Sequence, residues 1–282
     1  MTLATPQATL EVLRKFGLRL EKSLGQHFLV DQNILNKVIS AAWLTRDDVV
    51  VEVGPGIGTL TVELAKQVNM VISIELDHKL RPVLDYTLQG FDNARVIFAD
   101  ALSVNLKELP GDLITPNKLV SNLPYQIATP LLATYLDSFD NLDLFVVMVQ
   151  KEVADRIIAK PATSDYGLFS VKAQFYCEVE KIATVSRNVF IPPPEVSSAI
   201  VRLTRLPRPR VDVKDRNFFF KVVKAAFWQR RKTIKNALLG SPELDFSLNQ
   251  VNEALKRAGI DPRRRGETLS LQEFADLANA LI

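Results

Sequence analysis

Short runs of β-branched and other apolar residues recur at regular spacing along the first two hundred residues. They lie at positions 49–53, 70–74, 95–99, 119–121, 144–149, 181–185 and 199–203. Runs of this length and composition predict buried strands. Between the first five, segments of helical length place their apolar residues on one face, as in 60–66. Alternating strands and helices predict an α/β fold with a parallel, doubly wound sheet of seven strands.

The pattern changes after residue 203. Residues 206–210 read Leu-Pro-Arg-Pro-Arg, which is typical of a stiff basic connector. The residues beyond it show helical periodicity and no convincing strand. We therefore expect two domains, an α/β domain over 1–204 and a smaller all-helical domain over 205–282. Within the second, we interpret 218–238 as one helix with an apolar seam of Phe220, Val223, Phe227, Ile234 and Leu238.

Composition narrows the class of protein. A chain of 282 residues that is 47% hydrophobic can bury a sizeable core. It has no apolar run near the roughly 18 residues that span a bilayer and no signal-peptide pattern at its N-terminus, so we expect a cytoplasmic protein with no membrane contact, acting as a monomer. The single cysteine, Cys177, and only two histidines argue against a disulfide, a metal site or a His-based catalytic triad.

Charge is unevenly distributed. From Arg202 to Gly240 there are twelve Lys or Arg against two acids, a local charge of +10 in a chain whose net charge is +3. This excess predicts a polyanionic partner. A stripe of cations with an interleaved tryptophan favours a surface that follows phosphates and stacks on a base, although such a face can also be simply solvated. The candidate residues are Lys224, Trp228, Arg230, Arg231, Lys232 and Lys235.

Three successive predicted strands end in residues suited to a nucleoside. The first runs into Gly54-Pro55-Gly56-Ile57-Gly58, where glycines let the backbone approach a ligand. Such a loop fits a dinucleotide as well as other adenosyl ligands. The next strand ends near Glu75, about twenty residues later, where a carboxylate can bind both ribose hydroxyls. The third ends at Asp100, an acceptor for an adenine amino group.

The fourth predicted strand ends in Asn122-Leu123-Pro124-Tyr125. Asn122 offers an amide carbonyl, Pro124 stiffens the turn, and Tyr125 presents a ring for stacking. These residues suit a planar ring that bears an amino group. An ordinary Asn-X-Pro turn is the alternative for the tetrapeptide alone.

The order of glycine loop, Glu75, Asp100 and the Asn122 tetrapeptide resembles class I S-adenosylmethionine-dependent methyltransferases that act on adenine N6. A dehydrogenase would need an acid-base residue that is missing from the expected place. Six blocks resemble, more narrowly, the small-subunit ribosomal RNA adenine dimethyltransferases. They are residues 22–29, 122–130, 150–156, 166–167, 189–194 and 227–233.

This resemblance implies a Rossmann-like methyltransferase sheet and S-adenosylmethionine as methyl donor. The implied donor-binding residues are Gln26, His27, Leu29, Gly54, Gly56, Glu75, Asp100 and Asn122, with Gln26 closing over the methionine end. His27 stands where relatives often have Asn. The implied catalytic residues are Asn122, Leu123, Pro124, Tyr125 and Phe190, with the Tyr125 and Phe190 rings on either side of the target base.

The resemblance also implies the reaction, which is dimethylation of N6 on two adjacent adenines near the 3′ end of 16S rRNA in the immature 30S subunit. Large-subunit rRNA adenine methyltransferases of antibiotic resistance are the nearest alternative. A ribosome-assembly factor that acts mainly by binding is an alternative from another class. A DNA adenine methyltransferase is more distant.

Overall fold

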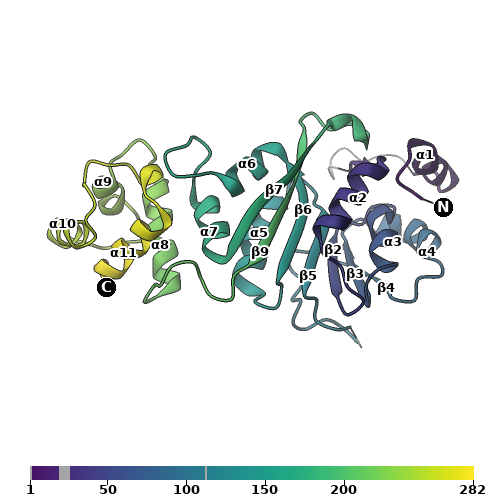
Figure 1. The fold of residues 1–282 in the computed structure, drawn as a ribbon, viewed down its shortest axis with the longest axis horizontal. Helices are drawn as coiled ribbons and strands as arrows, with labels where there is room; N and C mark the ends of the chain where they lie inside the picture. The colour runs from purple at the N-terminus through teal and green to yellow at the C-terminus, as the bar shows by residue number, and fades with distance from the viewer. Residues whose placement is uncertain (1, 19–25, 112) are drawn as a thin grey trace. The chain divides into compact units, whose positions relative to one another are not determined.

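The structure is a computed structural model that describes residues 2–18, 26–111 and 113–282. Its centre is a sheet of seven strands in the order β4-β3-β2-β5-β6-β9-β7 (Figure 1). The strands are β2 (Val49–Val53), β3 (Met70–Glu75), β4 (Ala94–Phe98), β5 (Lys118–Asn122), β6 (Leu144–Gln150), β7 (Cys177–Val185) and β9 (Ser198–Arg205). Each overlaps one of the seven predicted runs, which confirms the α/β class. Every residue of β2 is buried, as its valine-rich sequence requires.

Strands β4, β3, β2, β5 and β6 are parallel, whereas β9 runs antiparallel to β6. The parallel arrangement predicted from the helices between the first five strands is therefore confirmed for those strands, and β9 is an antiparallel addition that the pattern did not indicate. Only the 3-10 turn η3 (Arg187–Val189) and the short strand β8 (Phe190–Ile191) separate β9 from β7 in sequence. A parallel return needs a longer crossover, usually through a helix, so β9 comes back in the opposite direction.

The order of the sheet fixes where a ligand can bind. Strand β2 lies between β3 and β5, so the chain order reverses at β2. In open α/β sheets the carboxyl ends of the strands at such a reversal border a crevice. Figure 1 shows helices packed beside these strands. They include α2 (Gln32–Ala41), α3 (Thr59–Ala65), α4 (Arg81–Thr87) and α5 (Ala128–Ser138).

The N-terminal segment contributes to this edge through a pairing that the hydrophobic pattern did not predict. Helix α1 (Pro6–Lys15) starts at Thr5, whose side chain accepts a hydrogen bond from Ala8 N. Farther along, β1 (Phe28–Leu29) pairs antiparallel with β8, with Leu29 opposite Phe190. Residues 22–25 of the first family-like block lie outside the described residues.

The chain divides into two compact units, one of residues 1–154 and 179–205 and the other of 155–178 and 206–282. The sequence-based boundary after residue 204 lies next to the one at 205. Residues 155–178, however, which that division placed in the first domain, belong to the second unit. The helices that lie wholly in this unit are α7 (Leu168–Tyr176), α8 (Arg216–Trp228), α9 (Ile234–Leu239), α10 (Leu248–Arg257) and α11 (Leu271–Leu281), while α6 (Lys151–Ile158) spans the division.

Aromatic packing explains why 155–178 group with the C-terminal residues. The ring of Phe175 on α7 stacks on Phe219 of α8 at a centroid distance of 5.1 Å. Tyr166, which is 1% exposed, meets Phe227 of α8 edge to face at 5.8 Å. These contacts form a core within the second unit.

The interpretation of 218–238 as one helix is wrong. Helix α8 ends at Trp228, and α9 begins after Thr233, whose side chain accepts a hydrogen bond from Asn236 N. The polar residues 229–232 between them give no apolar face to continue, and Thr233 is a favourable N-cap. Of the predicted seam, Val223, Ile234 and Leu238 are fully buried, whereas Phe220 and Phe227 are only half-buried. Phe219 and Val222, which the seam left out, are fully buried.

No helix in the described part of the chain has both the length and the apolar character needed to cross a membrane.

Candidate active site

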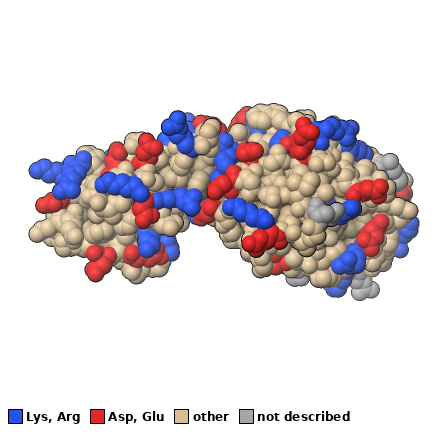
Figure 2. Space-filling model, turned by 90° about the horizontal axis from the view of Figure 1, so that it is seen from below, with Lys and Arg blue, Asp and Glu red and all other residues tan. Residues whose placement is uncertain are grey.

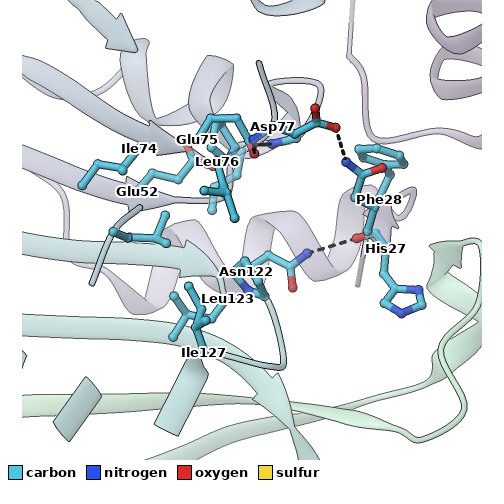
Figure 3. A pocket seen from close by; sticks show the side chains of 18 of the residues that line it. His27, Phe28, Glu52, Ile74, Glu75, Leu76, Asp77, Asn122, Leu123 and Ile127 are labelled. Atoms are coloured by element: carbon cyan, nitrogen blue, oxygen red, sulfur yellow. Dashed lines mark hydrogen bonds between the residues drawn. The ribbon is translucent and has the colours of Figure 1, made fainter. Parts of the chain in front are cut away.

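A cavity of about 310 Å³ opens at the carboxyl ends of the central strands. Its lining brings together all the residues predicted to hold the donor and most of those predicted to act on the acceptor. These are Gln26, His27, Leu29, Gly54, Gly56, Glu75, Asp100, Asn122, Leu123, Pro124 and Tyr125. Figure 3 shows several of them converging from β3, β5 and the segment before β1.

The glycine loop lies close to two other parts of the cavity lining, Pro124 and Phe28. Gly54 has a φ of +71°, and a Cβ placed on it would lie 2.9 Å from Cγ of Pro124. Gly56 has a φ of +59°, and its added Cβ would lie 2.9 Å from the ring of Phe28. Both positions therefore require glycine for the backbone angle and for the close approach.

Glu75 ends β3 with its carboxylate held by the main chain. Its side chain is buried, and its two oxygens accept hydrogen bonds from Gly56 N at 3.3 Å and Asp77 N at 2.9 Å. Burial raises the pKa of Glu75, and these backbone donors oppose that rise. The carboxylate is thus fixed in orientation on the lining of the cavity.

Asp77 and Gln26 form a second polar pair at this edge. The Gln26 side-chain amide donates to the Asp77 carboxylate at 2.9 Å, and both residues line the cavity. Asp77 was not among the residues predicted for the site. The available signal was the pair of acids, Glu75 and Asp77, at the end of one predicted strand.

Glu52 is another lining residue that the sequence analysis left out. It is 2% exposed, and one carboxylate oxygen accepts hydrogen bonds from the hydroxyls of Thr61 at 2.6 Å and Ser73 at 3.0 Å. Burial raises the pKa of Glu52 to about 7 despite these two donors. An acid inside the otherwise all-valine run 49–53 was the signal that could have identified it.

Three further groups on the cavity lining are free to contact a ligand. The buried Thr59 Oγ1 has no hydrogen-bond partner among the described residues. Leu76 is apolar and yet 59% exposed. Asp100 is exposed, and one of its carboxylate oxygens accepts from Leu102 N at 2.9 Å. A ligand with polar groups and an apolar face would satisfy all three.

The Asn122 side chain is oriented by the main chain of His27. Its amide nitrogen donates to the His27 carbonyl oxygen at 3.3 Å (Figure 3). The amide oxygen therefore remains as an acceptor for a ligand. Leu123 N donates to Met148 O at 3.1 Å, which fixes the next residue of the tetrapeptide to β6.

Tyr125 is held by its hydroxyl and by one ring face. The hydroxyl lies 2.7 Å from Ser198 Oγ, and the ring stacks on His27 at a centroid distance of 5.5 Å. Nδ1 of His27 lies in turn 2.8 Å from Pro192 O. Both the main chain and the ring of His27 therefore position acceptor-side residues, a role that the sequence did not indicate.

Phe190 is placed differently from the other predicted catalytic residues. It is 2% exposed, packs in the hydrophobic core with Leu29 and Val185, and is not part of the cavity lining. This arrangement leaves almost none of its ring available to a base, and its stacking role stays a prediction.

The predicted RNA-binding residues lie in the second unit but do not form one helical stripe. Trp228 is 59% exposed, and Arg231 and Lys232 are exposed. Lys224 pairs with Glu243, while Arg230 donates to Ser164 O at 2.8 Å and pairs with Glu267 at 3.2 Å. Lys235 is half-buried on α9.

Acids from later in the sequence reduce the charge excess of this unit. The whole second unit carries eighteen Lys or Arg against twelve Asp or Glu, a net charge of +6, whereas the first unit carries −3. On the face shown in Figure 2, basic and acidic side chains of the second unit are interspersed. The count of +10 over 202–240 therefore overstated the local field, although its sign remains positive.

Comparison with known proteins decides the family. A model of the ribosomal RNA adenine dimethylase family matches residues 17–282. The chain belongs to this family. It is 45% identical to ribosomal RNA small subunit methyltransferase A of Geobacillus thermodenitrificans, over 99% of this chain and 97% of that protein. The protein of the same name from Bacillus mycoides is 46% identical, with the same coverage.

Solved structures of similar proteins agree with this family. A dimethyladenosine transferase from Plasmodium falciparum has a TM-score of 0.74 and 25% identity, covering 89% of this chain and 96% of that one. The 23S rRNA methyltransferase ErmE has a TM-score of 0.67 and 28% identity, covering 90% and 99%. The Rossmann-like methyltransferase fold expected from the family resemblance is confirmed.

Proposed function

We propose that this protein transfers methyl groups from S-adenosylmethionine to N6 of two adjacent adenines near the 3′ end of small-subunit rRNA, giving N6,N6-dimethyladenosine. The observation that carries the proposal is the Asn122 amide, which is oriented by His27 O at the border of an adenosyl-binding edge. Family membership and the names of the relatives support the substrate. The immature 30S subunit is the proposed target.

The residues of the cavity fit S-adenosylmethionine. Glu75 would accept hydrogen bonds from the ribose hydroxyls, and Asp100 one from the adenine amino group. Leu76 would cover the purine, and the partnerless Thr59 hydroxyl would gain a polar partner. The Gln26 side chain, held by Asp77, would close the methionine end. The bound donor supplies an electrophilic methyl group.

The acceptor residues make adenine N6 a better nucleophile. The lone pair of this nitrogen is delocalised into the ring, so the planar amino group attacks poorly. Acceptance of its N–H hydrogens by the Asn122 side-chain oxygen and the Leu123 carbonyl favours a pyramidal nitrogen with its lone pair directed at the methyl group. The proton lost after transfer passes to water or a backbone acceptor, so no dedicated base is needed.

The target adenine has to leave any helix or stack to enter this cavity. The Tyr125 ring, fixed by Ser198 and His27, would stack on it and contribute about 1 to 3 kcal/mol. The second methylation proceeds with one N–H remaining, so one of the two acceptors then faces a methyl group. Cationic residues of the second unit would hold the RNA, chiefly the exposed Arg231 and Lys232 with Trp228.

Mass-spectrometric mapping of dimethyladenosine in rRNA from cells with and without the protein tests this function. Asn122→Ala should abolish methyl transfer while donor binding is retained or weakened. Asn69→Ala, at an exposed asparagine away from the cavity, is the matched control. Wild-type turnover by the Asn122→Ala enzyme would contradict the proposed role of the amide.

The likeness to ErmE favours one alternative substrate, an adenine of large-subunit rRNA. Methyl transfer to unmethylated 30S particles, compared with transfer to large-subunit rRNA, separates the two. A role in subunit assembly by binding alone predicts that a variant unable to bind the donor fully restores subunit maturation. The expected cytoplasmic location and monomeric state stay predictions.

A further inference from the structure

Trp43 occupies an unusual position just after helix α2. Its side chain is 55% exposed, so core packing does not account for it. Its φ is +47°, a left-handed conformation that glycine or asparagine usually takes at the end of a helix. For a bulky side chain this conformation is strained, and strain retained at an exposed residue points to a function.

The backbone of Trp43 is held in this conformation by Lys118. The Lys118 ammonium group donates to the carbonyl oxygens of Trp43 at 2.7 Å and Ala42 at 3.2 Å. The same ammonium group pairs with the Asp48 carboxylate at 2.8 Å, and the side chains of Lys118 and Asp48 are largely buried. The exposed ring therefore projects from a fixed support.

One face of the Trp43 ring is covered by a cation. The guanidinium carbon of Arg202 lies 3.8 Å from the ring centroid. Arg202 also pairs with Glu180 and donates to Ala41 O at 3.4 Å, which fixes its position on the ring. Within the described part of the chain, no other ring or cation stacks on Trp43, and the residue remains 55% exposed, which leaves ring surface for a planar group.

The Trp43 ring and the Arg202 side chain stacked on it lie away from the cavity. Lys118 begins β5, whereas Asn122 ends it, so Trp43 lies at the amino edge of the sheet and the cavity at the carboxyl edge. Trp43 is not among the cavity-lining residues.

We propose that Trp43, backed by Arg202, is a stacking site for an unpaired base of the RNA substrate. Stacking needs a single free ring face and tolerates any base. Stacking also does not depend on attraction to phosphate. The first unit, with a net charge of −3, offers little such attraction. The residues that follow, Thr45, Arg46 and Asp47, are exposed and polar, whereas the centre of a protein interface surrounds its aromatic residue with apolar ones.

The two tryptophans of the chain allow a direct test. In a Trp228→Phe variant, Trp43 is the only tryptophan and reports on its own surroundings. A single-stranded oligoribonucleotide of about ten nucleotides should quench its fluorescence. An abasic oligomer of the same length and charge is the control for phosphate contact alone and should leave the fluorescence unchanged.

Trp43→Gly distinguishes a binding role from a structural one. Glycine relieves the strain at φ of +47°, which offsets the loss of the Arg202 contact, so the melting temperature should change little. Loss of the stack should weaken oligoribonucleotide binding about tenfold. Trp43→Phe, which keeps a ring, should retain most of the affinity, and Leu10→Ala, at another exposed apolar residue of the first unit, should retain all of it.

The proposal rests on the proposed function only in naming RNA as the partner. Fluorescence quenching requires no methyl transfer, so quenching by RNA in a protein that fails to methylate would leave the stacking site standing. Two results together would overturn it in an enzyme that methylates normally: Trp43 fluorescence that RNA leaves unchanged in Trp228→Phe, and RNA affinity that stays unchanged in Trp43→Gly. Quenching by small-subunit proteins and not by RNA would overturn it as well and would identify a protein contact.

Discussion

Gly54 and Pro124 approach each other so closely that a methyl group added to Gly54 would lie 2.9 Å from the proline Cγ. Both residues line the cavity, and in the proposed reaction Gly54 would face the methyl donor and Pro124 the target base. The proline ring is rigid and cannot turn away, so neither side can shift without the other. Under the proposed function, this contact would help to set the distance between the methyl donor and the target base.

Gly54→Ala should lower kcat for methyl transfer by about a hundredfold, because displacement of either wall misaligns the reacting groups. Donor affinity should fall too. Steady-state methylation and calorimetric donor titration measure the two effects. Gly111→Ala is the matched control, since Gly111 has a φ of +73° and open space around its added Cβ. Similar losses in both variants would show that backbone strain alone is responsible.

The raised pKa of Glu75 leads to a prediction for how donor binding depends on pH. Its carboxylate has to be ionised to accept hydrogen bonds from two ribose hydroxyls, and burial raises its pKa. As the pH falls, donor affinity should therefore begin to decline at a higher pH than an ordinary glutamate would produce.

Glu75→Gln should weaken donor binding about ten- to hundredfold at neutral pH, through the loss of charge-assisted hydrogen bonds, and should flatten the pH profile. Titration calorimetry with S-adenosylhomocysteine between acid and neutral pH provides the measurement. Glu63→Gln, at a surface glutamate paired with Lys66, is the control. An unchanged pH profile in Glu75→Gln would assign the dependence to another group.

Glu52 should make the folded state less stable as the pH rises. Its pKa is about 7 in the folded protein, raised by burial, against an ordinary 4.5. The folded state thus binds more protons than the unfolded state between these values. Stability should fall through this window, by about 3 kcal/mol in total, and the loss should be complete above pH 7.

Glu52→Gln should remove this loss, because one amide oxygen can accept from both Thr61 and Ser73, which now donate to a single carboxylate oxygen. The variant should therefore be more stable than wild type at pH 8, with a difference that shrinks toward pH 4.5. Denaturant unfolding at several pH values measures it. Glu253→Gln on α10 controls for the removal of one charge. Equal curves for Glu52→Gln and wild type would contradict the raised pKa.

Substitutions of Arg230 and Lys232 should have different effects, on stability for Arg230 and on RNA binding for Lys232. Arg230 ties Ser164 and Glu267 together, so Arg230→Ala should lower stability by about 1 kcal/mol. Lys232 is exposed, and Lys232→Ala should reduce the slope of log affinity against log salt by about one. Thermal melting and RNA titration at several salt concentrations are the measurements. A full loss of salt slope in Arg230→Ala with unchanged melting would reverse the assignment.

The strands and most of the cavity could be predicted from the sequence because both depend on local signals. Valine-rich runs such as 49–53 are typical of strands at the centre of a sheet, and parallel strands bring their carboxyl ends to one edge. That edge collects Gly54, Glu75, Asp100 and Asn122 whatever the details of packing. Family resemblance supplied the identity of the donor and the RNA.

What the sequence did not predict depends on contacts between distant residues. The His27 carbonyl reaches Asn122 only because β1 pairs with β8, and no periodicity reports a two-residue pairing. The continuation of helical spacing past Trp228 concealed the break at Thr233. The acids that offset the basic segment come from later in the sequence, Glu243 from the turn after α9 and Glu267 from the 3-10 turn Gly266–Thr268.

The assignment of residues 155–178 to the second unit means that the chain passes between the two units three times, after residues 154, 178 and 205. Helix α7 is synthesised before α8, the helix whose Phe219 covers its Phe175. During translation the second unit therefore remains incomplete until the sheet has received its last strand, β9. A fragment ending at residue 204 would therefore carry α7 with the aromatic face that α8 covers in the full chain.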